Sequence, residues 1–391
     1  MWVKRVSYIV LVSLLVLELA PVISYASSST TQSTPIQYKE YTLFLFNNTL
    51  VSGNGVVKDS NIFPLGILYD PYNGLVYVAD CGNNQITVIN PTTMSVVDTI
   101  DVSGGPNRIA LDPINHLIYV TLSSSNQVAV LNPSTNAIVD HIPVGSDPTG
   151  IIYAEGLIYV ANHNGICVIN PNTDQVINTI STSGRPLFLA FDPVNGMIYA
   201  TTDSGVAVIN PKTDSQVTTI SLPFLWGVAV DPSTGYVYVA IAESGGYVAV
   251  INPSTNTVVN KIVNGSSPTI IKIGGNLMFV LNGFSDTLTI VNLTDDDVVA
   301  NIPVGNYPQG DCIVGNSIYV ANSKSSSISI IRLNIQITNV SVITPITTNN
   351  TSTPTLTTTQ TNNAHLFFLL LIVALIVVVL AVVIIIFVKK H

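Results

Sequence analysis

The feature that most constrains the fold of this chain is a segment of about 40 residues that is repeated seven times. A clear copy is Leu-Ile-Tyr-Val-Ala-Asn at residues 157–162, followed by Ile-Cys-Val-Ile-Asn-Pro at residues 166–171. A constant period of this length in a β-rich chain predicts an array of small, similar sheets. The aromatic residue of the first half recurs at Tyr77, Tyr119, Tyr159, Tyr199, Tyr238, Phe279 and Tyr319. The Asn of the second half recurs at Asn90, Asn132, Asn170, Asn210, Asn252 and Asn292, with Arg332 in the seventh place.

Each repeat has the pattern of four short strands. The first strand is apolar and ends in a turn such as Asp192-Pro193, where the Asp side chain can bond the backbone ahead and proline fixes φ. The second strand carries the repeated aromatic residue, the third alternates large and small apolar residues, and the fourth follows the Asn-Pro turn. Seven such blades packed in a ring bury one another's faces and leave no long open edge. The sequence therefore predicts an all-β fold, a seven-bladed β-propeller of four-stranded antiparallel blades.

These repeats resemble the YVTN repeats of β-propeller proteins, which are common in secreted and surface-layer-associated proteins of bacteria and archaea. The resemblance rests on Tyr-Val-Ala-Asn at residues 159–162, Val-Ile-Asn-Pro at 168–171 and Pro-Asn-Arg-Ile-Ala-Leu-Asp-Pro at 106–113. It covers about residues 64–333 and implies the propeller fold. It implies little about function, because such propellers serve as binding modules, as scaffolds and occasionally as enzymes.

The N-terminal residues predict export. Residues 1–26 contain Lys4 and Arg5, a short apolar run and a Ser-Tyr-Ala cleavage site, which together are typical of a signal peptide. The alternative is a membrane anchor, but the apolar run is short and Pro21 interrupts it. Residues 27–40 are rich in Ser, Thr and Gln, and we expect them to form a flexible N-terminal segment.

The two ends of the repeat region predict how the ring closes. The seventh repeat lacks the Asn-Pro turn after residues 328–331, and residues 41–51 form a spare strand-like segment before the first repeat opens at Pro64. We expect a strand from residues 41–51 to pair with residues 328–332 and complete the last blade, because an open strand edge would weaken the ring. The propeller then spans residues 41–336.

The C-terminal residues predict a tether to a membrane. Residues 337–364 are Thr-rich and uncharged, which is typical of an extended stalk. Residues 365–388 contain 23 consecutive apolar residues, enough for a transmembrane helix, and residues 389–391 form a short tail with Lys389 and Lys390. By the positive-inside rule the tail is cytoplasmic. We therefore expect a single-pass type I protein of the cell membrane, with its propeller extracellular.

Composition agrees with an extracellular role. Charged residues make up 9% of the chain and the net charge is −9, so the chain lacks the basic face that nucleic-acid binding needs. The Thr-rich stalk is a typical site for O-linked sugars. Asn residues in N-glycosylation sequons are candidates for modification, although sequons also arise by chance in a chain so rich in Asn, Ser and Thr. They are Asn47, Asn264, Asn292, Asn339, Asn349 and Asn350.

The chain shows no motif for catalysis, for a cofactor or for a metal ion. Asp295, Asp296 and Asp297 lack the spacing of a calcium loop, so a solvated turn is the simpler interpretation. Cys167 and Cys312 occupy positions where other repeats have small residues, which predicts small buried side chains. A disulfide between Cys81 and Cys312 is the alternative in an oxidising compartment.

The face formed by two sets of loops is the expected binding surface. These loops join the second strand to the third, and the fourth strand to the next blade. Local turn capping also explains the Asn and Asp residues in them, and packing between blades also explains Trp226. The candidate residues are Asp80, Asn107, Asn162, His163, Arg185, Asp203, Trp226, Glu243, Asn282, Phe284 and Asn322.

Two further expectations concern charge and function. Lys272 and Asp311 stand at apolar first-strand positions of neighbouring blades, so they either pair at the channel wall or reach water in the channel. We expect an extracellular binding or scaffold protein of the cell envelope, with a protein or glycan partner. The alternative is an extracytoplasmic enzyme of the hydrolase, lyase or lactonase type, which requires titratable groups placed together at the channel mouth.

Overall fold

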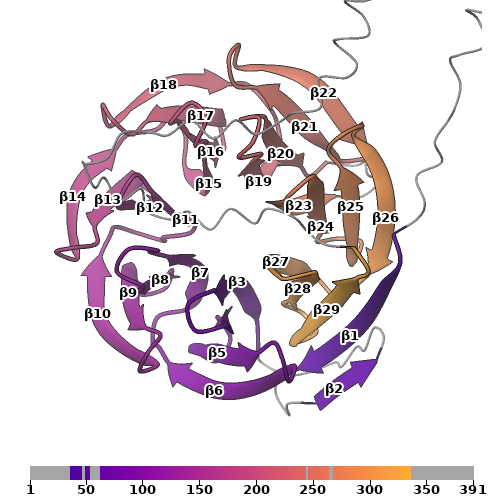
Figure 1. Ribbon diagram of the computed structural model, residues 1–391. Helices are drawn as coiled ribbons and strands as arrows, with labels where there is room; N and C mark the ends of the chain where they lie inside the picture. Colours follow the sequence, from indigo (N-terminus) through magenta and orange to yellow (C-terminus); the bar gives the residue numbers. More distant parts are fainter. Residues whose placement is uncertain (1–35, 46–48, 53–61, 244, 264–266, 336–391) are drawn as a thin grey trace, which may run out of the picture. The chain divides into compact units, whose positions relative to one another are not determined.

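The computed structural model describes residues 36–45, 49–52, 62–243, 245–263 and 267–335. Seven antiparallel sheets surround a central axis in this part of the chain (Figure 1). The predicted seven-bladed β-propeller of four-stranded blades is confirmed. Within the described ranges, no helix is long and apolar enough to cross a membrane. The predicted signal peptide, stalk, transmembrane helix and tail lie outside these ranges.

The first and second strands of the blades form the inner part of the ring. The first strands surround the axis, and they are β3 (Pro64–Asp70), β7 (Pro106–Leu111), β11 (Ile151–Ala154), β15 (Pro186–Phe191), β19 (Leu225–Val230), β23 (Pro268–Gly274) and β27 (Pro308–Val314). The second strands are β4 (Leu75–Asp80), β8 (Ile118–Leu122), β12 (Leu157–Asn162), β16 (Ile198–Thr202), β20 (Val237–Ile241), β24 (Leu277–Asn282) and β28 (Ser317–Asn322).

The third and fourth strands form the outer part of the ring. The third strands are β5 (Gln85–Asn90), β9 (Gln127–Asn132), β13 (Gly165–Asn170), β17 (Gly205–Asn210), β21 (Tyr247–Asn252), β25 (Thr287–Asn292) and β29 (Ser327–Leu333). The fourth strands of blades 1 to 6 are β6 (Ser95–Asp101), β10 (Ala137–Pro143), β14 (Gln175–Ile180), β18 (Ser215–Ile220), β22 (Thr257–Val263) and β26 (Asp297–Pro303). Blades are numbered in chain order, so blade 1 contains β3–β6 and blade 7 contains β27–β29.

Blade 7 is completed by the N-terminal part of the chain. β1 (Tyr38–Phe44) pairs antiparallel with β29 in a register that aligns Leu43 with Ile328. β2 (Thr49–Ser52) then pairs with the outer side of β1, so this sheet has five strands. The sequence placed one strand between residues 41 and 51, and the structure instead begins it at Tyr38 and folds the second half of that segment back as β2.

The repeated aromatic residues form the centre of each blade and also join neighbouring blades. Tyr77, Tyr119 and Phe279 are fully buried. The Tyr119 hydroxyl lies 3.5 Å from the carbonyl oxygen of Pro171 in the Asn-Pro turn of the next blade. The Tyr319 hydroxyl makes the same contact, at 3.3 Å, with Pro91 and so joins blade 7 to blade 1. The conserved spacing of the repeat therefore serves the packing between blades as well as within them.

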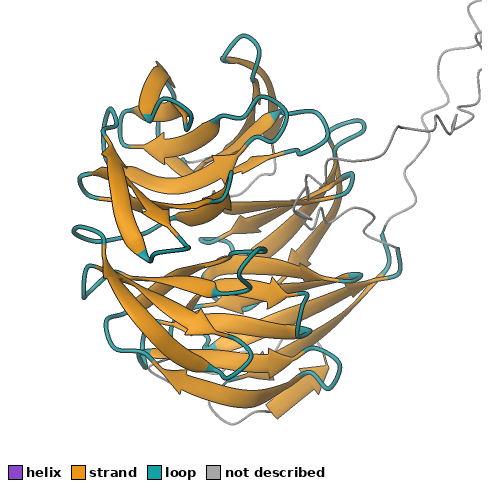
Figure 2. Cartoon of the chain, turned by 60° about the vertical axis from the view of Figure 1, so that its left-hand side comes forward, coloured by secondary structure: helices purple, strands orange, loops and turns teal. Residues whose placement is uncertain are grey.

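The loops lie on two opposite faces of the ring (Figure 2). The top face carries the loops between second and third strands and those that enter each first strand. The bottom face carries the turns between first and second strands and between third and fourth strands. The Asp side chains of the first-strand turns are buried, and Asp192 Oδ1 accepts a hydrogen bond of 2.8 Å from the Val194 amide, as expected for an Asp-Pro turn.

All three cysteines are free thiols. Cys167 and Cys312 are buried, as expected for small apolar side chains. The alternative of a Cys81–Cys312 disulfide is wrong in this structure. Cys81 follows β4 on the top face, whereas Cys312 lies within β27 and lines a cavity toward the bottom face, so the two residues stand at different levels of the ring.

Candidate functional site

Four of the predicted top-face residues hold the loops together from inside. Asp80, Asn162, Asn282 and Asn322 each end a second strand and each is buried. Asp80 accepts a 2.9 Å hydrogen bond from the Phe63 amide. Asn162 donates through Nδ2 to the carbonyl oxygen of Val144 at 2.7 Å. These side chains therefore act as caps of the loops and do not reach the surface of the top face.

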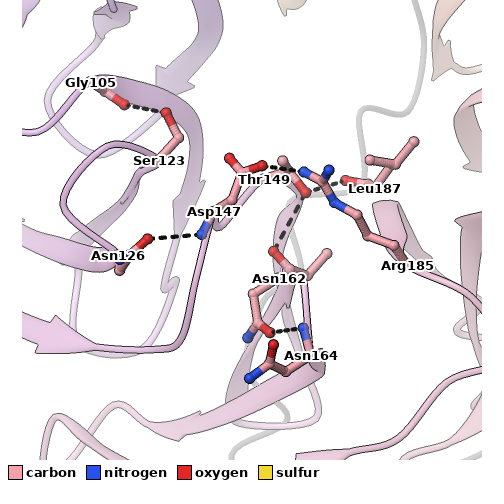
Figure 3. A network of polar contacts seen from close by, with 10 residues as sticks. Gly105, Ser123, Asn126, Asp147, Thr149, Asn162, Asn164, Arg185 and Leu187 are labelled. Carbon is pink, nitrogen blue, oxygen red and sulfur yellow. Dashed lines mark hydrogen bonds and ion pairs between the residues drawn. The ribbon is translucent and has the colours of Figure 1, made fainter.

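An ion pair joins two neighbouring top-face loops. Arg185, at the entry to blade 4, contacts the carboxylate of Asp147, at the entry to blade 3 (Figure 3). The Arg185 amide donates to Asp203 Oδ1 at 3.0 Å, and the Asp147 amide donates to Asn126 Oδ1 at 2.9 Å. Both charged side chains keep part of their surface accessible, so screening by solvent limits the stability that this pair contributes.

The other predicted top-face residues come from different blades, and Asn107 and Trp226 lie within strands β7 and β19 instead of in loops. His163 is exposed, like Asp203, whereas Asn107 and Glu243 are half-buried. Trp226 is half-buried and its ring lies 6.5 Å from that of Phe188 in the neighbouring blade. Trp226 therefore packs between blades, which is the simpler of the two interpretations of this residue.

Exposed aromatic and cationic side chains meet at the boundary of blades 6 and 7. Phe284 is 64% exposed, and its ring makes an edge contact with Tyr307 at 5.6 Å between centroids. Lys324 Nζ lies 4.2 Å from the centre of the Tyr307 ring, which is cation–π geometry. These three residues come from three different top-face loops. We call Phe284, Tyr307 and Lys324 the aromatic platform.

The backbone at Tyr307 is held in a conformation that bulky residues rarely adopt. Its φ is +56°, in the left-handed region that favours Gly, Asn and Asp. The Tyr307 amide donates to Asp286 Oδ1 at 2.7 Å, and its carbonyl oxygen accepts from Ser323 Oγ at 2.8 Å. Loops of blades 6 and 7 thus fix this residue from both sides, and the corresponding turns of blades 2 and 3 also have positive φ, at Gly105 and Asp147.

A second group of polar residues lies inside the ring, at the narrow part of the central channel. Arg108, on β7, extends across the channel and donates through Nη1 to the carbonyl oxygen of Gln309 on β27 at 2.8 Å. Its guanidinium carbon also lies 5.1 Å from the centre of the Phe188 ring on β15. Burial lowers the pKa of Arg108 to about 10, so the side chain remains charged at neutral pH. We call Arg108, Lys272 and Asp311 the channel triad.

Asp311 and Lys272 line the same cavity of about 190 Å³ as Arg108. Asp311 is 93% buried, and burial raises the pKa of its carboxyl to about 7 although Lys272 and Arg108 both lower it. Its Oδ2 atom has no hydrogen-bond partner. Lys272 is exposed within the channel, and the single ion pair among the described residues is Arg185–Asp147. Lys272 and Asp311 therefore share a channel without direct contact, and the predicted ion pair is not formed.

A wider cavity of about 580 Å³ adjoins this narrow part toward the bottom face. Its walls are mainly apolar and come from the first strands of blades 1 to 3 and 7, with Lys272 as its cationic residue. Pro71, Tyr72 and Pro113 belong to bottom-face turns and line its opening. We call this cavity the bottom vestibule.

The sequence identified only part of these two groups. Arg108 stands in a first strand at a position where the other blades have Gly, Phe or Ile, and that deviation is as visible in the sequence as the one at Lys272. Tyr307 and Lys324 gave no signal, because their meeting with Phe284 depends on loops from two blades. Among the described residues, no group of three or more His, Cys, Asp or Glu side chains is placed to hold a metal ion.

Comparisons with known proteins support the fold. A family model described as a domain of unknown function, DUF5074, matches residues 69–229. The matching model is not a YVTN-repeat model, so the resemblance stated from the sequence is supported at the level of the propeller fold. No curated protein matches the chain.

Solved structures of similar shape cover most of the chain. Hydrazine synthase of Kuenenia stuttgartiensis has a TM-score of 0.60 at 20% identity, over 71% of this chain and 97% of its own. Virginiamycin B lyase from Staphylococcus aureus has a TM-score of 0.63 at 15% identity, over 76% of this chain and 100% of its own. A streptogramin B lyase is similar, with a TM-score of 0.61 at 15% identity, over 76% of this chain and 98% of its own. At these identities the likeness shows the fold alone.

Proposed function

We propose that this chain is a membrane-anchored, extracellular β-propeller of the cell envelope that binds a protein or glycan partner through its top face. The observation that carries the proposal is the aromatic platform. It places an exposed phenylalanine, a tyrosine and a lysine side by side on one rim, and aromatic side chains such as tyrosine are enriched among the residues that dominate binding energy.

The way in which the platform is built supports a binding role. Tyr307 keeps part of its surface accessible, and its left-handed backbone belongs to the turn that enters blade 7, as at Gly105 and Asp147 in the corresponding turns of blades 2 and 3. The hydrogen bonds that the Tyr307 backbone makes with Asp286 and Ser323 fix the loop before any partner arrives. A preorganised surface loses less conformational freedom on binding, which favours affinity.

The location is supported by the sequence. Residues 1–26 have the pattern of a signal peptide, and residues 365–388 are long and apolar enough for one membrane span, followed by Lys389 and Lys390. The resemblance of the repeats to YVTN propellers of secreted and surface proteins points to the same place. The Thr-rich residues 337–364 would then hold the ring away from the membrane.

The test is a binding screen with the full-length chain displayed on cells. The probes are immobilised glycans and cell-envelope proteins, and each hit is measured again with a Phe284→Ser, Lys324→Ser double variant. The control is Val97→Ser, Lys212→Ser, because Val97 is 51% exposed on β6 and Lys212 is exposed in a bottom-face turn. We expect the platform variant to lower affinity about tenfold or more and the control to leave it unchanged. Equal binding by the two variants would contradict the proposal.

A further inference from the structure

We propose that the bottom vestibule and the channel triad together form a binding site for a small amphipathic acid, a molecule with one anionic head and a compact apolar body. This site lies inside the ring and opens toward the bottom face. It is independent of the partner-binding role proposed for the top face.

The channel supplies cations for the anionic head. Lys272 lines both the narrow part of the channel and the bottom vestibule, so this cationic residue borders the two cavities. Arg108 lies in the narrow part, where one of its five N–H donors is used by Gln309 O. A carboxylate that reaches this level meets an ammonium and a guanidinium group without displacing an existing ion pair.

The charges of the channel triad do not balance by themselves. Two cationic side chains face one carboxyl group, and that carboxyl holds its proton over part of the neutral range because its pKa is about 7. The triad therefore carries a net positive charge, and among the described residues no other carboxylate lines the narrow cavity. An excess of one sign along an enclosed channel attracts a counter-ion, and a bound anion would compensate it.

One buried atom of the triad points to a polar ligand group. Asp311 is 93% buried, yet its Oδ2 atom has no hydrogen-bond partner. An unpaired buried carboxyl oxygen costs stability, and such atoms are rare in folded proteins unless a water molecule or a ligand satisfies them. When Asp311 is protonated, its hydroxyl can donate to a carboxylate that is held by Lys272 and Arg108.

The bottom vestibule accepts an apolar body. Its walls include Ile67, Ile109, Ile151 and Tyr153, and its volume of about 580 Å³ lies within the range of small-molecule sites. Apolar walls with one cationic group at the inner end favour a ligand whose charge and apolar part are separated. A fully polar anion would make no favourable contact with the apolar walls. An apolar cation would be repelled by the positive charge of Lys272.

The experiment measures saturable binding of radiolabelled octanoate to the full-length chain in lipid nanodiscs by equilibrium dialysis. Lys272→Met is the test variant, because the side chain is exposed within the channel and its loss removes charge without opening the core. Lys261→Met is the matched control, because Lys261 lies on outer strand β22, over the Tyr247 ring at 4.3 Å, away from the channel. Octanoate dissolves equally in the lipid of all samples, so differences between them report the protein site.

We expect the wild-type chain and Lys261→Met to bind octanoate with equal affinity, and Lys272→Met to bind it about tenfold more weakly. Competition experiments then test separately whether the site needs the anionic head and the apolar body of the ligand. Anilinonaphthalene sulfonate, which is also an amphipathic anion, should displace octanoate, whereas acetate and octyltrimethylammonium should not. Absence of saturable binding to the wild-type chain, equal binding by Lys272→Met, or equal displacement by acetate or by the cation would each overturn the proposal.

Discussion

At the scale of single residues, Asp311 links the ionisation of the channel to the stability of the ring. The pKa of its carboxyl is about 7 in the folded protein, against an ordinary value of 3.8. Between about pH 4 and about pH 7 the folded state therefore binds more protons than the unfolded state, so the stability that this group contributes falls as the pH rises. Asp311→Asn should remove this pH-dependent loss of stability. The fall in Tm between about pH 5 and about pH 8 should therefore be smaller in the variant than in the wild-type chain.

Other buried carboxyl groups share the direction of this shift, so the comparison needs a control. Burial also raises the pKa of Glu40, to about 7, and those of Asp70 and Asp112. These groups are present in both the wild-type chain and Asp311→Asn, so their contribution to the pH dependence of Tm cancels when the two proteins are compared. Asp295→Asn, at an exposed turn position, should keep the wild-type pH dependence. If Asp311→Asn keeps it too, Asp311 does not carry an elevated pKa.

Sequence reasoning at this scale works for residues whose role is local. The Asp-Pro turns follow from the chemistry of two neighbouring residues, and Asp192 behaves as that chemistry predicts. It fails for residues whose role depends on distant neighbours. Asn162 and Asn322 are polar residues of a type that is found at binding surfaces. Strand register and packing decide whether such a side chain points outward or caps its own loop.

At the scale of elements, strand β1 closes the ring between the first and last repeats. Leu43 of this strand is fully buried and belongs to the apolar cluster between blades 7 and 1. Leu43→Ala should lower the free energy of unfolding by about 2–5 kcal/mol, because it removes buried methyl groups and leaves a cavity. Leu50, which pairs with Leu43 from β2, is 38% exposed. Leu50→Ala should change the free energy of unfolding by about 0.5 kcal/mol or less.

Denaturant unfolding of the full-length chain measures both values, and a single transition for all described blades is expected because the closed ring couples them. A Leu43→Ala effect as small as that of Leu50→Ala would mean that β1 does not hold the ring closed.

The boundary of β1 also shows what sequence reasoning misses. Residues 38–40 are polar in composition, yet they pair with residues 331–333 because blade 7 offers an open edge there.

At the scale of the whole molecule, the architecture can be predicted best from the sequence. Seven repeats show the same strand pattern, so an ambiguous position in one repeat is resolved by the others. A fixed period, an apolar alternation and an Asp-Pro turn in several blades leave few folds open. The bottom vestibule is the opposite case. It exists because first strands from several blades end around one axis, and no single repeat contains it. Sites built from many blades are therefore visible only once the ring is assembled.

The path of the chain through the ring leads to the last prediction, which concerns orientation. β1 begins and β29 ends on the bottom face, where the Asn334 amide donates to the carbonyl oxygen of Gln37 at 3.1 Å. The chain therefore enters and leaves the described propeller on that face. If residues 365–388 span a membrane, the bottom face is the tethered side and the top face points outward on average. Asn292 is the last residue of β25 and lies at the bottom face, whereas Asn264 falls outside the described residues.

Antibodies against one loop from each face test this orientation on intact cells. The top-face epitope is the loop at residues 221–224, and the bottom-face epitope is the turn at residues 192–196. We expect the top-face antibody to bind intact cells more strongly than the bottom-face antibody, with equal binding after detergent extraction as the control. The stalk predicted for residues 337–364 lets the ring tilt, so the two signals should differ in degree. A bottom-face turn that is freely accessible while the top-face loop is masked would place the aromatic platform toward the membrane, where a large partner could not reach it.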